Sequence, residues 1–206
     1  MIRKLSLVLV GAVGLLLMAA GVVVILLRTS VNGFSAKAAP TAVEAFVAGS
    51  ARALAMPEAA RNKTNPIPNS PEALAEAKEH WADHCAGCHA NDGSANGTMG
   101  KQMYPPAPDM RQAKTQNLTD GELFYIIENG IRLTGMPGWG NGTEKSTEAS
   151  WKLVHFIRHL PRLTEGEISE MEKMNPKTPA DLEEEKQEAE FLNGGTPDAA
   201  AKSHHH

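Results

Sequence analysis

The longest run of apolar residues lies near the start of the chain. It covers the 23 residues from Leu5 to Leu27, in which Ser6 is the only polar side chain. A run of this length predicts a helix that can cross a lipid bilayer. The alternative is a cleavable signal peptide, whose apolar region is about 7 to 15 residues long with a small-residue cleavage site close behind. The candidate site Ala36-Lys37-Ala38 comes too late, so the pattern favours an uncleaved anchor.

The middle of the chain has apolar positions at the spacing of amphipathic helices. The first predicted helix begins at Ser70, a typical N-cap residue, with Pro71 at its first position, and continues to His84. Two more helices are expected at 122–129, after a capping box, and at 145–160. Because the last of these helices has an aromatic face that matches Trp81 on the first, we expect the two to cross.

Weaker patterns flank this region. Residues 28–69 are predicted to form a tether with one short helix at 43–56, whose modest apolar face suits packing on the domain or lying near a membrane surface. Further along, signals at Thr164 and Thr178 predict two more helices, the second covering 179–192. We expect this acidic extension to be a solvated surface arm.

The predicted fold class is all-α. It comprises a small domain of three to four helices, a preceding transmembrane helix and a helical extension behind. The predicted boundaries are a cytoplasmic tail at 1–4, a transmembrane anchor at 5–27, a tether with a short helix at 28–69, a compact domain at 70–163, and an acidic helical extension with a disordered tail at 164–206.

Charge is distributed unevenly along the chain. Residues 1–69 carry seven Lys and Arg against two Asp and Glu, residues 70–162 nine against eleven, and residues 163–206 four against eleven. The net charge therefore falls from +5 through −2 to −7. Nothing in this pattern suggests a nucleic-acid partner, and the acidic end indicates solvation or a basic partner.

The only two cysteines belong to the motif Cys85-Ala86-Gly87-Cys88-His89. C-x-x-C-H is the attachment signature of c-type haem. Two thiols about one helical turn apart can each add across one vinyl group of a haem, and the next residue then lies under the iron. His89 is therefore the predicted proximal ligand, through a ring nitrogen.

Other uses of a cysteine pair fit the sequence less well. A zinc site lacks its second pair of ligands, and a thioredoxin-type dithiol would follow a strand, whereas this motif follows a helical pattern. A local disulfide is a further alternative. His80 and His84 lie four residues apart, but two ligands on an exposed helical face make a poor metal site.

The segment 91–114 is rich in Gly, Pro, Asn and Asp, and we expect an irregular loop around one edge of the haem. A buried histidine ligand usually donates its second ring proton to a carbonyl or carboxylate. The favoured source is Tyr104-Pro105-Pro106-Ala107-Pro108, because prolines fix a backbone whose carbonyls stay free. Tyr104, Pro105 and Pro106 are therefore candidate cofactor-binding residues.

The loop Gly135-Met136-Pro137-Gly138-Trp139-Gly140 supplies the candidate sixth ligand of the iron. Its glycines let the backbone approach closely, and Pro137 fixes the direction of the chain. Met/His ligation by Met136 and His89 would raise the reduction potential and leave no open position for a substrate. Trp139 is a further candidate contact to the cofactor. Three methionines in the loop after the haem motif are rival ligands: Met99, Met103 and Met110.

The order of these parts resembles class I mono-haem cytochrome c over residues 70–163, and the whole chain is similar to a membrane-anchored bacterial variant of that family. Two segments depart from the general family pattern: the acidic tail beyond Leu163 and the polar stretch 141–147. The resemblance implies an all-α cytochrome c fold with one covalent haem c, thioether bonds at Cys85 and Cys88, axial ligands His89 and Met136, and the carbonyl of Pro105 or Pro106 as the partner of His89.

These features predict an electron-transfer protein rather than an enzyme. We expect a membrane-anchored carrier that passes single electrons between redox partners of a respiratory chain. Because c-type haem is attached outside the cytoplasm, the expected location is the inner membrane, single-pass, with the haem domain on the periplasmic side. One alternative is a fixed cytochrome c subunit of a larger membrane respiratory or dehydrogenase complex. Another is a haem enzyme or gas sensor, which needs an open sixth position that Met136 argues against.

Overall fold

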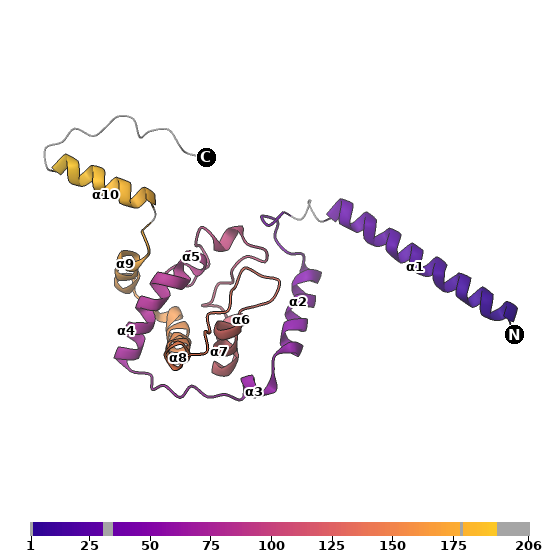
Figure 1. Ribbon diagram of the computed structural model, residues 1–206, viewed down its shortest axis with the longest axis horizontal. Helices are drawn as coiled ribbons and strands as arrows, with labels where there is room; N and C mark the ends of the chain where they lie inside the picture. The colour runs from indigo at the N-terminus through magenta and orange to yellow at the C-terminus, as the bar shows by residue number, and fades with distance from the viewer. Residues whose placement is uncertain (1, 31–34, 178, 193–206) are drawn as a thin grey trace.

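The computed structural model describes residues 2–30, 35–177 and 179–192, and within them every regular element is a helix (Figure 1). This confirms the predicted all-α fold. The predicted disordered tail lies outside the described residues. The elements are α1 (Ile2–Ser30), α2 (Ala42–Ala55), α3 (Glu58–Arg61), α4 (Pro71–His80), η2 (Trp81–Cys85), α5 (Ala86–His89), η3 (Gly100–Gln102), α6 (Ala113–Gln116), α7 (Asp120–Asn129), α8 (Glu144–His159), η4 (Leu160–Arg162), α9 (Glu165–Met174) and α10 (Pro179–Leu192).

The helices begin at the capping residues found in the sequence. Ser70 Oγ accepts a hydrogen bond from the backbone N–H of Ala73 at 3.2 Å, and a proline occupies the first turn of α4. Capping boxes at Thr119 and Thr164 open α7 and α9, as predicted. A third capping box, at Thr41, opens α2 and was not anticipated.

The core forms where α4 and η2 cross α8. The rings of Trp81 and Phe156 lie 5.5 Å apart, and both side chains are buried. α7 packs on the same helix through Phe124, whose ring stacks on Trp151 at 4.0 Å. Aromatic pairs of this kind contribute about 0.5–1.5 kcal/mol beyond the area that they bury. The predicted crossing of the first and last domain helices is therefore present.

The segment before α4 packs on the domain. Ala60 of α3 is buried, and a side chain at Gly121 of α7 would collide with the Ala60 carbonyl. Asn65 Nδ2 donates to the Trp151 carbonyl at 2.9 Å, which joins this segment to α8. Residues 58–69 therefore form part of the domain surface and hold α3 against α7.

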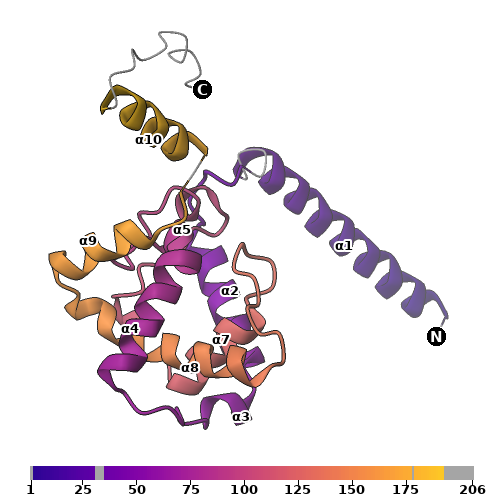
Figure 2. The same ribbon diagram turned by 60° about the vertical axis from the view of Figure 1, so that its left-hand side comes forward.

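α9 corrects the expectation that the whole extension is a solvated arm. Met171 is fully buried in the core cluster, and Lys78 of α4 donates to Glu170 at 2.6 Å. Acidic composition misled the prediction because a narrow apolar stripe through Met171 is enough to pack the helix on the core, and acidic residues can lie on either side of it. The described residues of α10, in contrast, are almost all exposed, and the helix projects from the domain (Figure 2).

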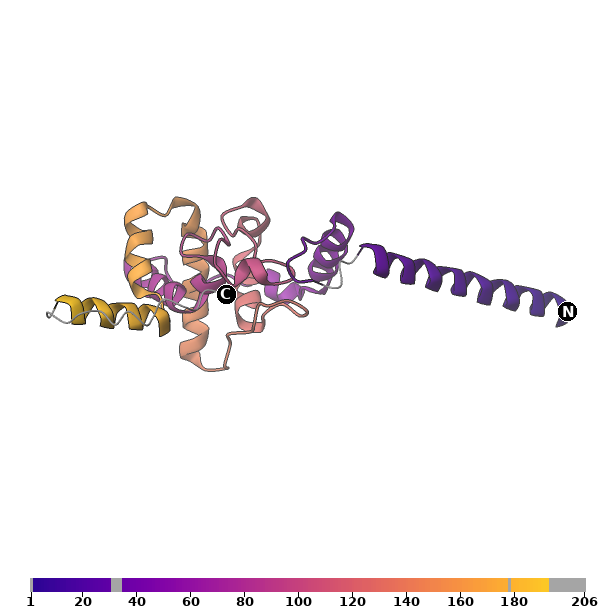
Figure 3. The same ribbon diagram turned by 90° about the horizontal axis from the view of Figure 1, so that it is seen from above.

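α1 projects from the other end of the molecule. Residues Ser6–Thr29 are long and apolar enough to cross a membrane, and none of the most apolar part of this span is buried against the rest of the protein. Seen from above, α1 and α10 point away from opposite ends of the domain (Figure 3). The helix therefore fits the predicted membrane anchor.

Candidate haem-binding site

The two cysteines lie where the winding of the helix changes. α4 ends at His80, and η2 (Trp81–Cys85) forms one π-helical turn that leads into α5. The helical path predicted to His84 is present, but its last turn is wider than an α-helix. Turns of this type are frequent at functional sites. Cys85 and Cys88 are both free thiols, so the disulfide alternative is not realised.

Both thiols are held in their protonated form. Burial raises the pKa of Cys85 to about 12, with a smaller contribution from Cys88. Burial also raises the pKa of Cys88. Because zinc binding and dithiol exchange both use the thiolate, this environment disfavours the two rival uses of the motif. It suits thiols whose sulfurs become neutral thioethers.

His89 ends α5 with its ring beside Trp81, at 5.7 Å between ring centroids. Trp81 Nε1 donates to the carbonyl of Ala90 at 3.0 Å, which fixes the backbone directly after the histidine. Burial lowers the pKa of the His89 ring, so the neutral form that binds iron is favoured. The Nδ1 atom is buried and has no hydrogen-bond partner.

The carbonyl that acts on His89 belongs to Pro108. It raises the pKa of the ring and so opposes burial, although it does not complete a hydrogen bond to Nδ1. The family pattern implied Pro105 or Pro106 instead. The carbonyl that affects the pKa of His89 therefore lies in the predicted proline-rich stretch, two or three residues later than expected.

The loop after the motif is pressed against the backbone of α5. A side chain at Gly97 would come within 2.7 Å of the Gly87 carbonyl, and one at Gly100 would overlap the carbonyl of Cys88. The backbone N–H of Ala107 then donates to the Gly100 carbonyl at 3.0 Å. These close contacts turn the chain back so that Pro108 reaches His89.

Tyr104 has a different neighbour from the one expected. Its side chain is 39% exposed, and its hydroxyl lies near the carboxylate of Glu44 in α2. Thr41 lowers the pKa of Glu44 most, and the Tyr104 hydroxyl, which also stabilises the charged carboxylate, lowers it further. Desolvation raises the pKa of Tyr104 first, and the Glu44 carboxylate raises it further. The structure thus joins Tyr104 to α2, at the edge of the candidate site.

Met136 lies in a loop that folds back onto the end of α7. Gly130 ends the helix with φ +68°, and a side chain there would come within 2.6 Å of the Met136 carbonyl. The Met136 N–H donates to Thr134 Oγ1 at 3.1 Å, and its carbonyl accepts from Ile131 N–H at 3.1 Å. Glycine is required at this turn because of both its left-handed conformation and the close approach of the backbone.

One of the rival methionines, Met103, lies against the Met136 loop. The sulfur of Met103 lies so close to Gly135 that a side chain at that position would overlap it. Met99 is 56% exposed, and Met110 packs against the hydrophobic core. Met103 is therefore the rival ligand that the structure brings nearest to the Met136 loop.

Trp139 joins the Met136 loop to the segment that carries the haem motif. Its ring lies 5.4 Å from the ring of His84, which in turn lies 4.9 Å from that of His80. The Nδ1 atom of His84 is 2.7 Å from the carboxylate of Asp83. Trp139 is thus placed between the two segments that provide the candidate iron ligands.

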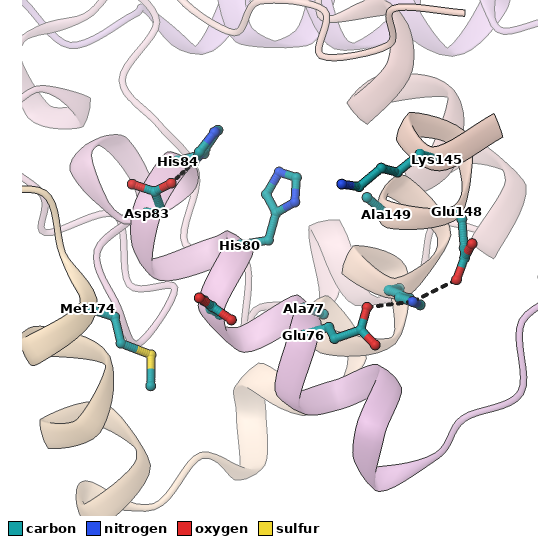
Figure 4. Close-up of a pocket in the computed structure, with 11 residues that line it drawn as sticks. Glu76, Ala77, His80, Asp83, His84, Lys145, Glu148, Ala149 and Met174 are labelled. Carbon is teal, nitrogen blue, oxygen red and sulfur yellow. Dashed lines mark hydrogen bonds and ion pairs between the residues drawn. The ribbon is translucent and has the colours of Figure 1, made fainter. Parts of the chain in front are cut away.

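His80 and His84 also line a pocket of about 590 Å³ between α4, α8 and α9 (Figure 4). Lys152 bridges Glu76 and Glu148 at its rim, at 2.6 and 2.7 Å. In the part of the chain that the structure describes, no group of three or more His, Cys, Asp or Glu side chains is arranged to hold a metal ion. His80 and His84 therefore have no third ligand near them that would complete a metal site among the described residues.

The side chains around the motif fit a covalently bound haem. One helical segment presents two free thiols and a half-buried histidine with a lowered pKa and a buried ring nitrogen that has no partner. A second loop contains Met136, and the sulfur of Met103 lies beside Gly135 of that loop. A helical fold with this donor set defines the class of c-type cytochromes.

The comparison with protein families agrees with this class. Residues 72–157 match the family model described as cytochrome c oxidase, cbb3-type, subunit III. This part of the chain is a mono-haem c-type cytochrome domain that carries covalently bound haem c and serves electron transfer. No curated protein was found to match the chain.

Two side chains that support the site are not signalled by any motif in the sequence. Asn175, with its amide nitrogen facing α4, donates to the carbonyls of Ala82 at 3.0 Å and Met171 at 3.1 Å, and it pairs with Asn91. His155 Nε2 lies 2.7 Å from the Ile67 carbonyl. The position of Asn175 directly after α9 was the only available signal, since asparagine is favoured near helix ends.

Proposed function

We propose that this protein is a membrane-anchored electron carrier whose haem iron is held by His89 and Met136. The observation that carries the proposal is the half-buried His89 ring, whose Nδ1 atom is buried without a partner, directly after two free thiols. Bound haem c supplies one-electron oxidation and reduction of its iron. The chain attaches the haem through Cys85 and Cys88, keeps His89 neutral, and orients that ring against Trp81.

The apolar α1 helix supports the anchored part of the proposal. In this arrangement α1 crosses the inner membrane with its amino terminus in the cytoplasm, because c-type haem is attached on the other side. The haem domain is then periplasmic. Confinement to the membrane surface raises the effective concentration of the domain near membrane-bound donors and acceptors of the respiratory chain.

Optical spectra under carbon monoxide test the ligation. We expect the reduced wild-type protein to keep its bands under carbon monoxide, because Met136 fills the sixth position. Met136→Ala should bind carbon monoxide readily and shift its bands. The reduction potential of this variant should fall, since thioether ligation favours ferrous iron.

Met103→Ala is the matched control, because Met103 lies against the same loop. It should leave both the carbon monoxide response and the potential unchanged. A shift in Met103→Ala with none in Met136→Ala would assign the ligand to Met103. Ready binding of carbon monoxide by the wild type would reject a closed site and favour a haem enzyme or sensor.

A second candidate function is a fixed subunit of a larger respiratory complex. The family model that matches residues 72–157 is described as a subunit of an oxidase, and this favours the alternative. Purification from membranes in mild detergent distinguishes the two functions. Stoichiometric partners that stay bound through size-exclusion chromatography would favour the subunit, whereas a monodisperse monomer with intact haem would favour the free carrier.

A further inference from the structure

α2 is an apolar helix whose large side chains are uncovered. It contains only two charged residues, Glu44 and Arg52, and none of its residues is buried. A helix of this composition is normally covered by protein or by lipid. Its large apolar side chains are all strongly exposed: Val43 by 71%, Phe46 by 73%, Val47 by 58% and Leu54 by 87%.

These side chains share one face of the helix. At about 100° per residue, Val43, Val47 and Leu54 fall within about 40° of one another, and Phe46 borders them. Ala45 lies about 180° from Leu54, on the opposite face, and is also exposed. The exposed apolar side chains therefore form a stripe rather than a scatter.

The domain contacts α2 near both of its ends. Near its beginning, the Glu44 carboxylate lies close enough to the hydroxyl of Tyr104 in the haem loop for each group to shift the pKa of the other. Just beyond its end, Arg61 of α3 forms an ion pair with Glu122 of α7 at 3.2 Å. The direction of the apolar stripe is therefore coupled to the orientation of the haem domain.

α2 also lies close to the anchor. Ala42 follows Thr29, the last residue of the candidate span, by thirteen positions, and that length of chain reaches at most about 45 Å. Figures 1 and 3 show α2 between α1 and the rest of the domain, running across the direction of α1. A helix placed in this way lies along the surface of a bilayer that α1 crosses.

The charges near α2 suit an anionic surface. Residues 28–63 carry five Lys and Arg against two Asp and Glu, a net charge of +3. Residues 163–206 carry −7, and α10 projects from the end of the domain opposite α1. Basic residues attract anionic lipid headgroups and acidic residues avoid them. The charge distribution thus favours lipid at the α2 end of the molecule.

We propose that α2 is an interfacial helix that rests its Val43, Phe46, Val47 and Leu54 stripe in an anionic lipid surface and so fixes the orientation of the haem domain. This inference rests on the proposed function through its membrane anchor. Lipid is favoured over a partner protein because the chain itself keeps α2 beside the membrane, next to a basic segment.

Spin-label accessibility tests this arrangement in the full-length holoprotein. Both native thiols are then in thioether bonds, so an introduced cysteine is the only free thiol. Leu54→Cys and the matched control Ala45→Cys, on the opposite face, are labelled in nanodiscs of phosphatidylcholine and phosphatidylglycerol. We expect the ratio of accessibility to oxygen over accessibility to a water-soluble nickel complex to be several-fold higher at Leu54 than at Ala45.

Two outcomes at Leu54 would overturn the inference. High accessibility to the nickel complex would place the stripe in water, and low accessibility to both reagents would place it against protein. A label at Leu16→Cys in α1 separates the inference from the anchor. Lipid exposure at Leu16 with water exposure at Leu54 rejects the interfacial helix alone, whereas water exposure at Leu16 rejects the anchor and the inference together.

Discussion

Asn175 supports the segment that carries the haem motif from a distant part of the chain. Its amide donates to the carbonyl of Ala82, which lies inside the π-helical turn before Cys85. A π-helical turn pairs residues five apart instead of four, and the Asn175 amide adds a donor to a carbonyl within it. One side chain thereby fixes the approach of the chain to the first thiol.

Replacing Asn175 should destabilise the domain. We expect Asn175→Ala to lower the free energy of unfolding by about 1–3 kcal/mol, because the buried Ala82 carbonyl loses its donor. Urea unfolding followed by haem absorbance measures this change. The exposed Asn117→Ala is the control and should change little. Equal stability of Asn175→Ala and the wild type would show that the carbonyl finds another donor.

Asp109 makes the stability of the domain depend on pH in the acid range. Its hydrogen bond with Arg111 holds the pKa of the Asp109 carboxyl at about 2. A carboxyl with a lowered pKa stabilises the folded state above its unfolded pKa of about 4 and loses this effect as the pH falls toward 2. The stability gap between wild type and Asp109→Asn should therefore shrink over this range in urea unfolding. A gap independent of pH would contradict the ion pair.

At the scale of elements, the acidic composition of α9 gave no indication that this helix packs on the core. Ile168, Met171 and Met174 recur on one face, and Met171 is completely buried. Lys78 and Glu170 join this helix to α4 across the pocket side of the domain. α9 is therefore a structural helix of the haem domain, and α10 is the arm.

The two parts of the extension should respond differently to change. Met171→Ala should cost about 2–5 kcal/mol of stability, because it opens a cavity in the core. A chain that stops after Lys177 loses α10 but keeps α9, so its stability should match that of the wild type. Thermal unfolding of both variants checks this. A large loss of stability on removing α10 would contradict the assignment of α10 as an arm.

Local sequence signals predicted where the helices begin, but they did not predict which distant residues contact one another. Ser70, Thr119 and Thr164 marked helix starts correctly because a cap depends only on neighbouring residues. Pro108 and Asn175 were missed because their roles depend on how distant segments meet. The haem motif could be recognised from the sequence because covalent attachment requires a fixed local spacing of Cys85, Cys88 and His89. No tertiary information is needed to identify it.

At the scale of the whole molecule, the anchor and the haem domain are separable. α1 is exposed along its span, whereas the core of the domain is formed by α4, α7 and α8. A chain that begins at residue 35 behind a cleavable export signal should therefore be released into the aqueous fraction with the haem spectrum of the full protein. Loss of haem from this chain would show that α1 supports the site itself.

The order of the elements along the chain sets when the haem segment becomes covered. The motif ends at His89, whereas α9 and Asn175, which pack on the turn before it, are made some eighty residues later. A chain that is exported from its amino terminus therefore presents Cys85 and Cys88 before α9 has been made. The motif is therefore open to the attachment machinery before α9 and Asn175 pack on the turn that leads into it.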